Sequence, residues 1–342
     1  MLQERVSGPA AWTGAELRTS EGWVHRLSDA EIDELDAALR NVQRQGITLY
    51  DVTREDFPLP TLGSIVDGWV LDLEEGRGFI LVKGLPIERY DEEEASIIYW
   101  GLGRHMGVPV SQNASGDLLG HVRDTGRSIK DPSVRGYQTR VRLPYHTDGS
   151  DVVGLLCFRP ARSGGLSSIV SSTTIYNEVL RRRPDLVELL YQPFIYDRRE
   201  EQGPGEATWY ASPIACYLDG KLSMRYVRGF IESAQRFPEV PRITERQREL
   251  LDLIDAIAND PDVVLRMDFE PGDMQFVNNY TIFHSRTDYE DFEEPERRRH
   301  LLRLWLTLRD GRRLDPAFGH GMGTEDANGG RGGVQPVAPA SR

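Results

Sequence analysis

The pattern of apolar and polar residues predicts both helices and strands along this chain. After Ser28, which begins a capping box, apolar residues recur at helical spacing until Gly46 ends the helix. The apolar run at 78–82 is typical of a buried strand, and a second helix is expected from Asp91. We expect the two helices to form a layer that packs on the outside of a barrel.

The later part of the chain alternates between short strands and turns. Strand residues at 152–170 are interrupted by a turn at 160–165, and the pair Asp219-Gly220 favours a hairpin turn. Helices are expected at 175–190 and after Thr244, and further strands at 263–267, 274–277 and 299–308. Short strands separated by turn signals favour a jelly roll.

The two ends of the chain lack such periodicity. Residues 1–20 are polar with small side chains and are expected to be loose, and the Gly-, Pro- and Ala-rich residues 319–342 are expected to form a flexible tail. Between them we expect a single domain at 21–318 with an insert around 175–260. Within the insert, the charged residues 198–206 fit either an ordinary solvated loop or a lid over a site.

Composition narrows the class of protein. A 39% hydrophobic fraction in 342 residues is enough for a sizeable core, and a net charge of −13 disfavours nucleic acid as a partner. The two cysteines, Cys157 and Cys216, form no disulfide framework and are expected to be small buried residues. The chain shows no signal-peptide pattern and no run of about 18 apolar residues. We therefore expect a cytoplasmic protein without a membrane segment, and a homo-oligomer stays open.

The strongest chemical signal is the pair His146 and Asp148, followed much later by His284. Residues two apart in an extended segment project to the same side, so His146 and Asp148 can reach one metal ion. Two histidines and one carboxylate are the ligands that hold non-haem Fe(II) while leaving positions open for a co-substrate and O2. The triplet alone is weak, because a buried histidine more often satisfies a hydrogen bond than binds a metal.

A second signal lies in the strand expected at 299–308. With a period of two, Arg299 and Arg303 share one face, about 13 Å apart along the strand, while the other face is apolar after His300. Arginine is suited to bind a carboxylate through two hydrogen bonds. An edge strand with solvated arginines is the alternative, but close to a candidate metal group the anion-binding interpretation is favoured.

These motifs resemble the TauD/TfdA family of Fe(II)- and 2-oxoglutarate-dependent dioxygenases. The resemblance covers about residues 75–310 and rests on four segments. They are GYQTRVRLPYHTD at 136–148, the GGLS turn at 164–167, PGDMQFVNN at 271–279 and RRHLLR at 298–303. The resemblance implies an α+β fold, with a double-stranded β-helix (jelly roll, cupin-like) core flanked by helices.

The resemblance also implies roles for individual residues. His146, Asp148 and His284 match the iron ligands, and Arg299 matches the arginine that binds the distal carboxylate of 2-oxoglutarate. The implied cofactors are Fe(II), 2-oxoglutarate as co-substrate, and O2. Because Asp148 is present, halogenation, which relatives lacking this carboxylate perform, is disfavoured.

Four further positions carry weaker signals. Ser167 stands where the family usually has a threonine that helps to hold 2-oxoglutarate, although a one-residue slip would give that place to Ser168. Arg303 matches a position that contacts an anionic substrate or the co-substrate. Residues 223–228 alternate as a strand does, which puts Arg225 and Arg228 on opposite faces. We expect at least one of these arginines to meet a small anionic or zwitterionic substrate; pairing with internal Asp or Glu is the alternative.

The expected reaction is oxidation, most often hydroxylation, of an aliphatic C–H bond in a small carboxylate or amino-acid-like substrate, with release of succinate and CO2. The same chemistry could instead serve desaturation or cyclisation in natural-product biosynthesis. Two other classes stay open: a cupin-like hydrolase or isomerase using a different metal, and a non-catalytic jelly-roll binding protein. Oxygen uptake that depends on 2-oxoglutarate separates these classes.

Overall fold

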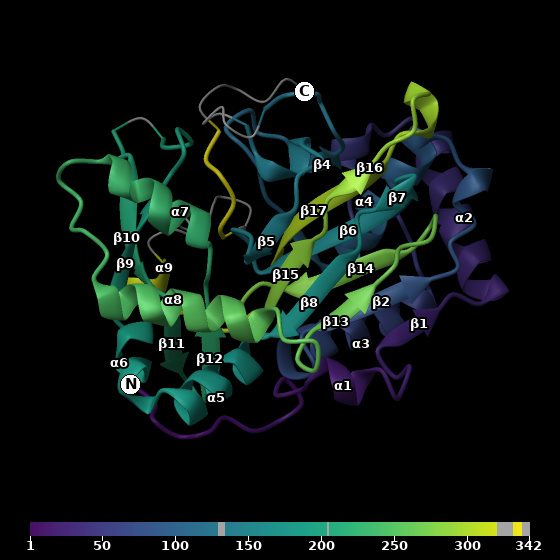
Figure 1. Ribbon diagram of the computed structural model, residues 1–342. Helices are drawn as coiled ribbons and strands as arrows, with labels where there is room; N and C mark the ends of the chain where they lie inside the picture. The colour runs from purple at the N-terminus through teal and green to yellow at the C-terminus, as the bar shows by residue number, and fades with distance from the viewer. Residues whose placement is uncertain (129–133, 204, 320–330, 337–342) are drawn as a thin grey trace.

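Two packed β-sheets form the centre of the fold (Figure 1). The structure is a computed structural model that describes residues 1–128, 134–203, 205–319 and 331–336. The larger sheet has the order β1-β2-β14-β6-β17-β3, with β4 also paired to β17. Its strands are β1 (Val24–Arg26), β2 (Phe79–Lys83), β3 (Gly107–Pro109), β4 (Leu119–Val122), β6 (Val152–Arg159), β14 (Met274–Asn278) and β17 (His300–Leu308). The smaller sheet has the order β13-β8-β15-β5. Its strands are β5 (Leu143–His146), β8 (Ser167–Ser171), β13 (Leu265–Met267) and β15 (Ile282–Arg286).

Side chains from both sheets meet in one apolar cluster, which includes Phe79, Val153, Ile169 and Ile282. All strand pairs except β1 with β2 are antiparallel. The strand β17 is buried at every position. This packing of two antiparallel sheets agrees with the jelly roll expected from the sequence.

Helices cover the outer face of the larger sheet, as the sequence predicts. They are α2 (Asp29–Gln45), α3 (Leu62–Glu75) and α4 (Glu92–Met106). Ser28 and Asp91 each form a capping box at a helix start, and Gly46 ends α2 in the left-handed conformation, with φ 65°. Apolar residues of these helices pack with the leucines of β17 in the largest core cluster.

The segment between β8 and β13 builds a second core of its own. It contains α5 (Ser172–Arg182), η4 (Pro184–Leu186), α6 (Val187–Leu190), β9 (Pro193–Asp197), β10 (Trp209–Pro213), β11 (Ala215–Leu218), β12 (Lys221–Met224), α7 (Arg228–Ser233), η5 (Ala234–Arg236) and α8 (Glu245–Ala258). Asp219 and Gly220 form the predicted hairpin turn, with φ 50° and 81°. The strand expected at 223–228 is wrong beyond Met224, because Arg228 instead begins α7 and pairs with Glu232 one turn later.

The remaining short elements connect these layers. They are α1 (Gly14–Leu17), η1 (Leu49–Asp51), η2 (Ile87–Arg89), η3 (Gly136–Gln138), β7 (Ser163–Gly164), β16 (Tyr289–Glu290), η6 (Pro295–Arg297) and α9 (Pro316–Gly319). Cys157 and Cys216 are both buried and free, as expected. Among the described residues, no helix is long and apolar enough to cross a membrane.

The first 20 residues, expected to be loose, are attached to the sheets and to α5. The indole N–H of Trp12 donates to the carbonyl of Arg77 at 2.9 Å, and the hydroxyl of Thr174 donates to the carbonyl of Trp12. The reason is burial of the apolar side chains of Trp12 and Leu17. Of the tail expected at 319–342, residues 320–330 and 337–342 lie outside the described residues, whereas 331–336 are hydrogen bonded to the core.

Candidate active site

Three potential metal ligands meet at one end of the two sheets. His146 on β5 and His284 on β15 are directly opposite each other in an antiparallel pair, and their ring centroids are 4.2 Å apart. Asp148 follows two residues after His146, and its backbone N–H donates to Oδ1 of Asn279 at 2.9 Å. The carboxylate oxygens of Asp148 lie 3.6 Å from Nε2 of His146 and 3.9 Å from Nε2 of His284. One ligand atom from each residue falls within 4.8 Å of the others.

The hydrogen bonds around these side chains leave their metal-binding atoms available. Nδ1 of His146 donates to the carbonyl of Pro144 at 2.8 Å, because a carbonyl can only accept. That bond fixes the tautomer in which Nε2 carries the lone pair. Nε2 of His284 is buried and has no hydrogen-bond partner. A buried nitrogen without a partner is costly, so this observation fits a bound metal ion.

The charges at this group also suit a metal ion. Burial, together with the neighbouring His146, lowers the pKa of His284 to about 3, so its imidazole is neutral. Burial acts to raise the pKa of Asp148, but the nearby His284, Arg303 and His146 outweigh it and hold the pKa below its usual value. Neutral imidazole and ionised carboxylate are the protonation states that metal binding requires.

A second group of two histidines and a carboxylate, formed by Glu92, His121 and His300, is a poorer candidate. Nδ1 of His121 and Nε2 of His300 are 2.8 Å apart and share a hydrogen bond. The other ring nitrogen of His300 lies 3.3 Å from a guanidinium nitrogen of Arg159. Both nitrogens of His300 are therefore occupied, and a positive charge lies where a cation would have to bind.

A small cavity of about 50 Å³ extends from the metal-ligand group between the sheets. Arg286, Arg299 and Arg303 all line it, and Nη1 of Arg299 is buried without a hydrogen-bond partner. Gly165 lies against this arginine: its φ is 72°, and a Cβ there would be 3.2 Å from Nε of Arg299. Burial lowers the pKa of Arg299, which makes an anionic partner for this guanidinium favourable.

Ser167 and Ser168 lie on opposite faces of the same strand, β8. Ser167, at the start of β8, lines the small cavity and donates to Oε1 of Gln275 at 3.2 Å. Ser168 points to the other face of β8, where it interacts with the hydroxyl of Tyr145. The geometry therefore brings Ser167, and not Ser168, beside Arg299.

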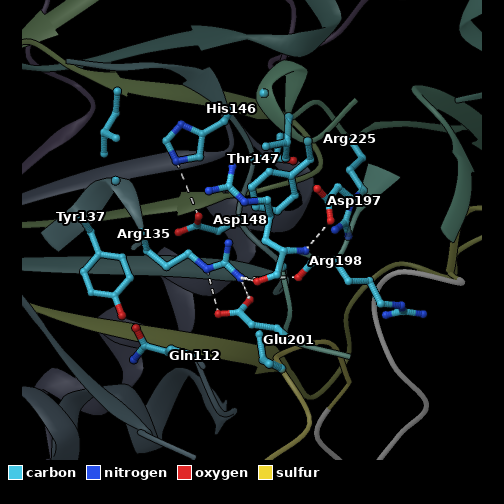
Figure 2. Close-up of a pocket in the computed structure, with 18 of the residues that line it drawn as sticks. Gln112, Arg135, Tyr137, His146, Thr147, Asp148, Asp197, Arg198, Glu201 and Arg225 are labelled. Carbon is cyan, nitrogen blue, oxygen red and sulfur yellow. Dashed lines mark hydrogen bonds and ion pairs between the residues drawn. The ribbon is translucent and has the colours of Figure 1, made fainter. Parts of the chain in front are cut away.

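A larger cavity of about 500 Å³ adjoins the same group on its other side (Figure 2). Arg225 and Arg303 are both buried in its wall, and Nη2 of Arg225 donates to the hydroxyl of Tyr210 at 2.7 Å. The backbone N–H of Thr147 donates to the carbonyl of Tyr226 at 2.9 Å. This bond attaches the segment between β8 and β13 to the chain that carries His146 and Asp148.

The loop at 198–206, in which residue 204 lies outside the described residues, lines the larger cavity through Arg198, Arg199, Glu201 and Glu206. This position fits either of the two roles expected for the loop. Its Glu201 accepts two bonds from Arg135, at 2.8 and 2.6 Å (Figure 2). Its Arg198 lies 3.6 Å from Glu206. Arg199 adopts a positive φ of 54°. Arg135 and Arg198 at this cavity are thus each paired with a carboxylate from this loop.

Some residues of this site were not predicted from the sequence. Arg286 follows His284 by two positions on β15, so the strand period could have indicated that both face the same cavity. Trp305 donates from Nε1 to Oδ2 of Asp148 at 2.9 Å. Gln112 accepts from Nε of Arg303 at 2.6 Å, and no pattern in the sequence connects these two residues.

Comparisons with known proteins agree with this geometry. A family model described as "Taurine catabolism dioxygenase TauD, TfdA family" matches residues 27–305. The chain is 34% identical over 323 residues to FR-33289 synthase of Streptomyces rubellomurinus. The aligned region covers 92% of this chain and 94% of that protein.

Solved structures with low sequence identity share the fold. Asparagine oxygenase in complex with Fe(II), 2S,3S-3-hydroxyasparagine and succinate matches with a TM-score of 0.66 and 18% identity, over 87% of this chain and 98% of that chain. The non-heme iron oxygenase OrfP in complex with Fe and alpha-ketoglutaric acid matches with a TM-score of 0.62 and 13% identity, over 83% and 94%. The α+β fold with a double-stranded β-helix core is thereby confirmed.

Proposed function

The chain belongs to the TauD/TfdA family of dioxygenases, and from that premise we propose that His146, Asp148 and His284 hold its iron. The expected enzyme class is confirmed: the protein is an oxidoreductase that uses Fe(II) and 2-oxoglutarate. The observation that carries the proposal is the convergence of these three side chains where the two cavities meet. Iron bound there would supply oxidation of a substrate C–H bond, coupled to conversion of 2-oxoglutarate and O2 into succinate and CO2.

The co-substrate would extend from this group into the small cavity. Arg299 binds its distal carboxylate through the guanidinium face that has no protein partner at Nη1. The hydroxyl of Ser167 lies along the same cavity and would donate to the co-substrate in place of its bond to Gln275. Arg303 lines both cavities, so it can contact either the co-substrate or the substrate.

The substrate would occupy the larger cavity, and it carries a carboxylate. Two buried guanidinium groups, those of Arg225 and Arg303, favour an anionic group in this cavity. Nη1 of Arg303 is 3.8 Å from Oδ2 of Asp148, whose charge a bound metal ion would share. A small amino acid or related acid is the substrate class that these charges and the cavity volume of about 500 Å³ support best.

A coupled turnover screen tests this function. The protein, supplied with Fe(II) and 2-oxoglutarate, is incubated with amino acids and small carboxylic acids, each beside its neutral amide or ester. We expect substrate-dependent succinate release from acids and a product that has gained one oxygen atom. A product that has lost two hydrogens would instead indicate desaturation or ring closure. Turnover with neutral compounds but not with acids would contradict the proposed substrate class and leave the iron chemistry intact.

A further inference from the structure

The segment 331–336 returns to the end of the sheets that carries Asp148, and Figure 1 shows it in yellow between α7 and β5. Nε of Arg331 contacts both carboxylate oxygens of Asp151, at 2.9 and 3.1 Å. Its backbone N–H donates to the hydroxyl oxygen of Thr307 at 2.8 Å, and that hydroxyl donates to the carbonyl of Arg331 at 2.7 Å. Asp151 is only 1% exposed, so the segment is anchored to the interior beside the end of β17.

Two glycines allow the backbone of this segment to pack closely against the backbone that follows Asp148. The backbone N–H of Gly333 donates to the carbonyl of Gly149, and that of Val334 donates to the carbonyl of Ser111 at 2.9 Å. Gly332 and Gly333 have φ values of 81° and 76°. A Cβ on Gly332 would lie 2.5 Å from the carbonyl oxygen of Gly149, and one on Gly333 would lie 2.7 Å from that of Ser111. A side chain at either position would force the segment away.

The same segment lines the larger cavity through Gly333, Val334 and Gln335. Val334 packs against the apolar cluster that contains Trp305, the residue hydrogen bonded to Asp148. At its far end, Oε1 of Gln335 lies 2.9 Å from the position that a Cβ on Gly203 would take. The segment thus spans the distance from the candidate metal ligand to the loop at 198–206.

We propose that residues 331–336, termed the C-terminal wall, are anchored through Arg331, present an uncharged side to the substrate site through Gly333, Val334 and Gln335, and hold the loop at 198–206 in place. The part of this inference that concerns substrate rests on the proposed function. Gly333, Val334 and Gln335 bring no charge to the cavity, whereas the arginines and carboxylates come from other elements. The C-terminal wall therefore meets the neutral portion of the substrate and positions it beside the metal-ligand group.

Three chains test the C-terminal wall without any turnover. One ends after Gly330 and lacks the wall, one ends after Pro336 and keeps it as the matched control, and one is full length with Gly333→Val. Trypsin cleaves after Arg198 and Arg199, which lie in the loop that the wall contacts. Cleavage there should be about tenfold faster in the first and third chains, because the loop opens more often. The control should match the full chain.

Steady-state kinetics, measured with the substrate that the turnover screen identifies, test whether the C-terminal wall positions the substrate. Loss of the wall should raise the KM for substrate about tenfold and leave the KM for 2-oxoglutarate unchanged, with more succinate formed per product. Equal tryptic cleavage in all chains, or a parallel rise of both KM values, would overturn the inference. If the chain ending after Gly330 fails to fold by circular dichroism, Gly333→Val decides. If the full chain turns over no 2-oxoglutarate, the proposed function fails, while the cleavage rates still decide whether the wall holds the loop.

Discussion

Trp305 donates a hydrogen bond from its indole nitrogen to Oδ2 of Asp148 at 2.9 Å, although the two residues lie on different parts of the chain. The bond fixes one carboxylate oxygen and leaves Oδ1 directed toward Nε2 of His146. Groups that orient a metal ligand in this way contribute to metal affinity without touching the metal.

We predict that Trp305→Phe weakens Fe(II) binding while the fold is kept. The phenylalanine ring fills most of the same space but cannot donate to Asp148, and loss of such a bond typically costs about tenfold or more in metal affinity. Titration of the metal-free protein with Fe(II) under anaerobic conditions measures the change. An unchanged affinity would show that Asp148 is oriented by its backbone bond to Asn279 alone.

His146→Ala and Asp148→Ala should each abolish Fe(II) binding and turnover. Neither side chain belongs to an apolar core cluster, so circular dichroism should show a folded protein. His121→Ala is the matched control, because it removes a histidine from the other group of two histidines and a carboxylate. The iron content of each variant after reconstitution with Fe(II) distinguishes the two ligand variants from the control. Normal iron content in either ligand variant, or its loss in the control, would refute the assignment of the metal group.

Arg299→Leu should raise the concentration of 2-oxoglutarate needed for half-maximal turnover by more than about tenfold. Removing one partner of a buried charged hydrogen bond costs about 2–5 kcal/mol. Arg298→Leu is the control, since this neighbouring arginine is exposed and its guanidinium donates to the backbone carbonyls of Phe292 and Glu293. Similar 2-oxoglutarate requirements in the two variants would assign Arg299 a structural role instead.

His300 should make the protein less stable in acid. Burial, with His121 and Arg159 nearby, lowers the pKa of His300 to about 3, against about 6.5 for an unfolded histidine. Between these pH values the unfolded chain binds a proton that the folded protein does not. The free energy of unfolding therefore falls as pH decreases from about 6.5 toward 3, by up to about 1.4 kcal/mol per pH unit for this group.

Urea unfolding of the original protein and of His300→Gln at about pH 7 and about pH 4.5 measures this effect. The variant has no titrating group at position 300, so its stability should fall less over the same interval. An equal loss in both proteins would mean that other residues account for the acid sensitivity.

Much of the fold could be predicted because it rests on local signals. The capping boxes at Ser28 and Asp91 specify helix starts through residues three apart, and Asp219-Gly220 specifies a hairpin through its own backbone preference. Period-two alternation on β17 separated Arg303 from Leu302, Leu304 and Leu306 of the core. None of these features depends on a distant contact.

What could not be predicted depends on contacts between distant segments. Gly332 and Gly333 look like part of a flexible tail, and only their fit against Gly149 and Ser111 gives them a defined conformation. Arg228 was predicted in a strand but begins α7, where it forms ion pairs with Glu232 on α7 and Asp255 on α8. Contacts of this kind cannot be read from the sequence, because the partners are brought together only by the fold.

The strand β17 is buried along its whole length and sends Arg303 and Trp305 to the active-site side and leucines to the helical side. A shift of one residue in its pairing would exchange these two sets, so the placement of Arg303 and Trp305 beside the larger cavity and the packing of the core depend on the same strand register. A change in the register of β17 that alters the side chains facing the larger cavity would therefore also disturb the packing of the core. New substrate preferences are better sought in the segment between β8 and β13 and in the C-terminal wall, neither of which is paired to β17 as a strand.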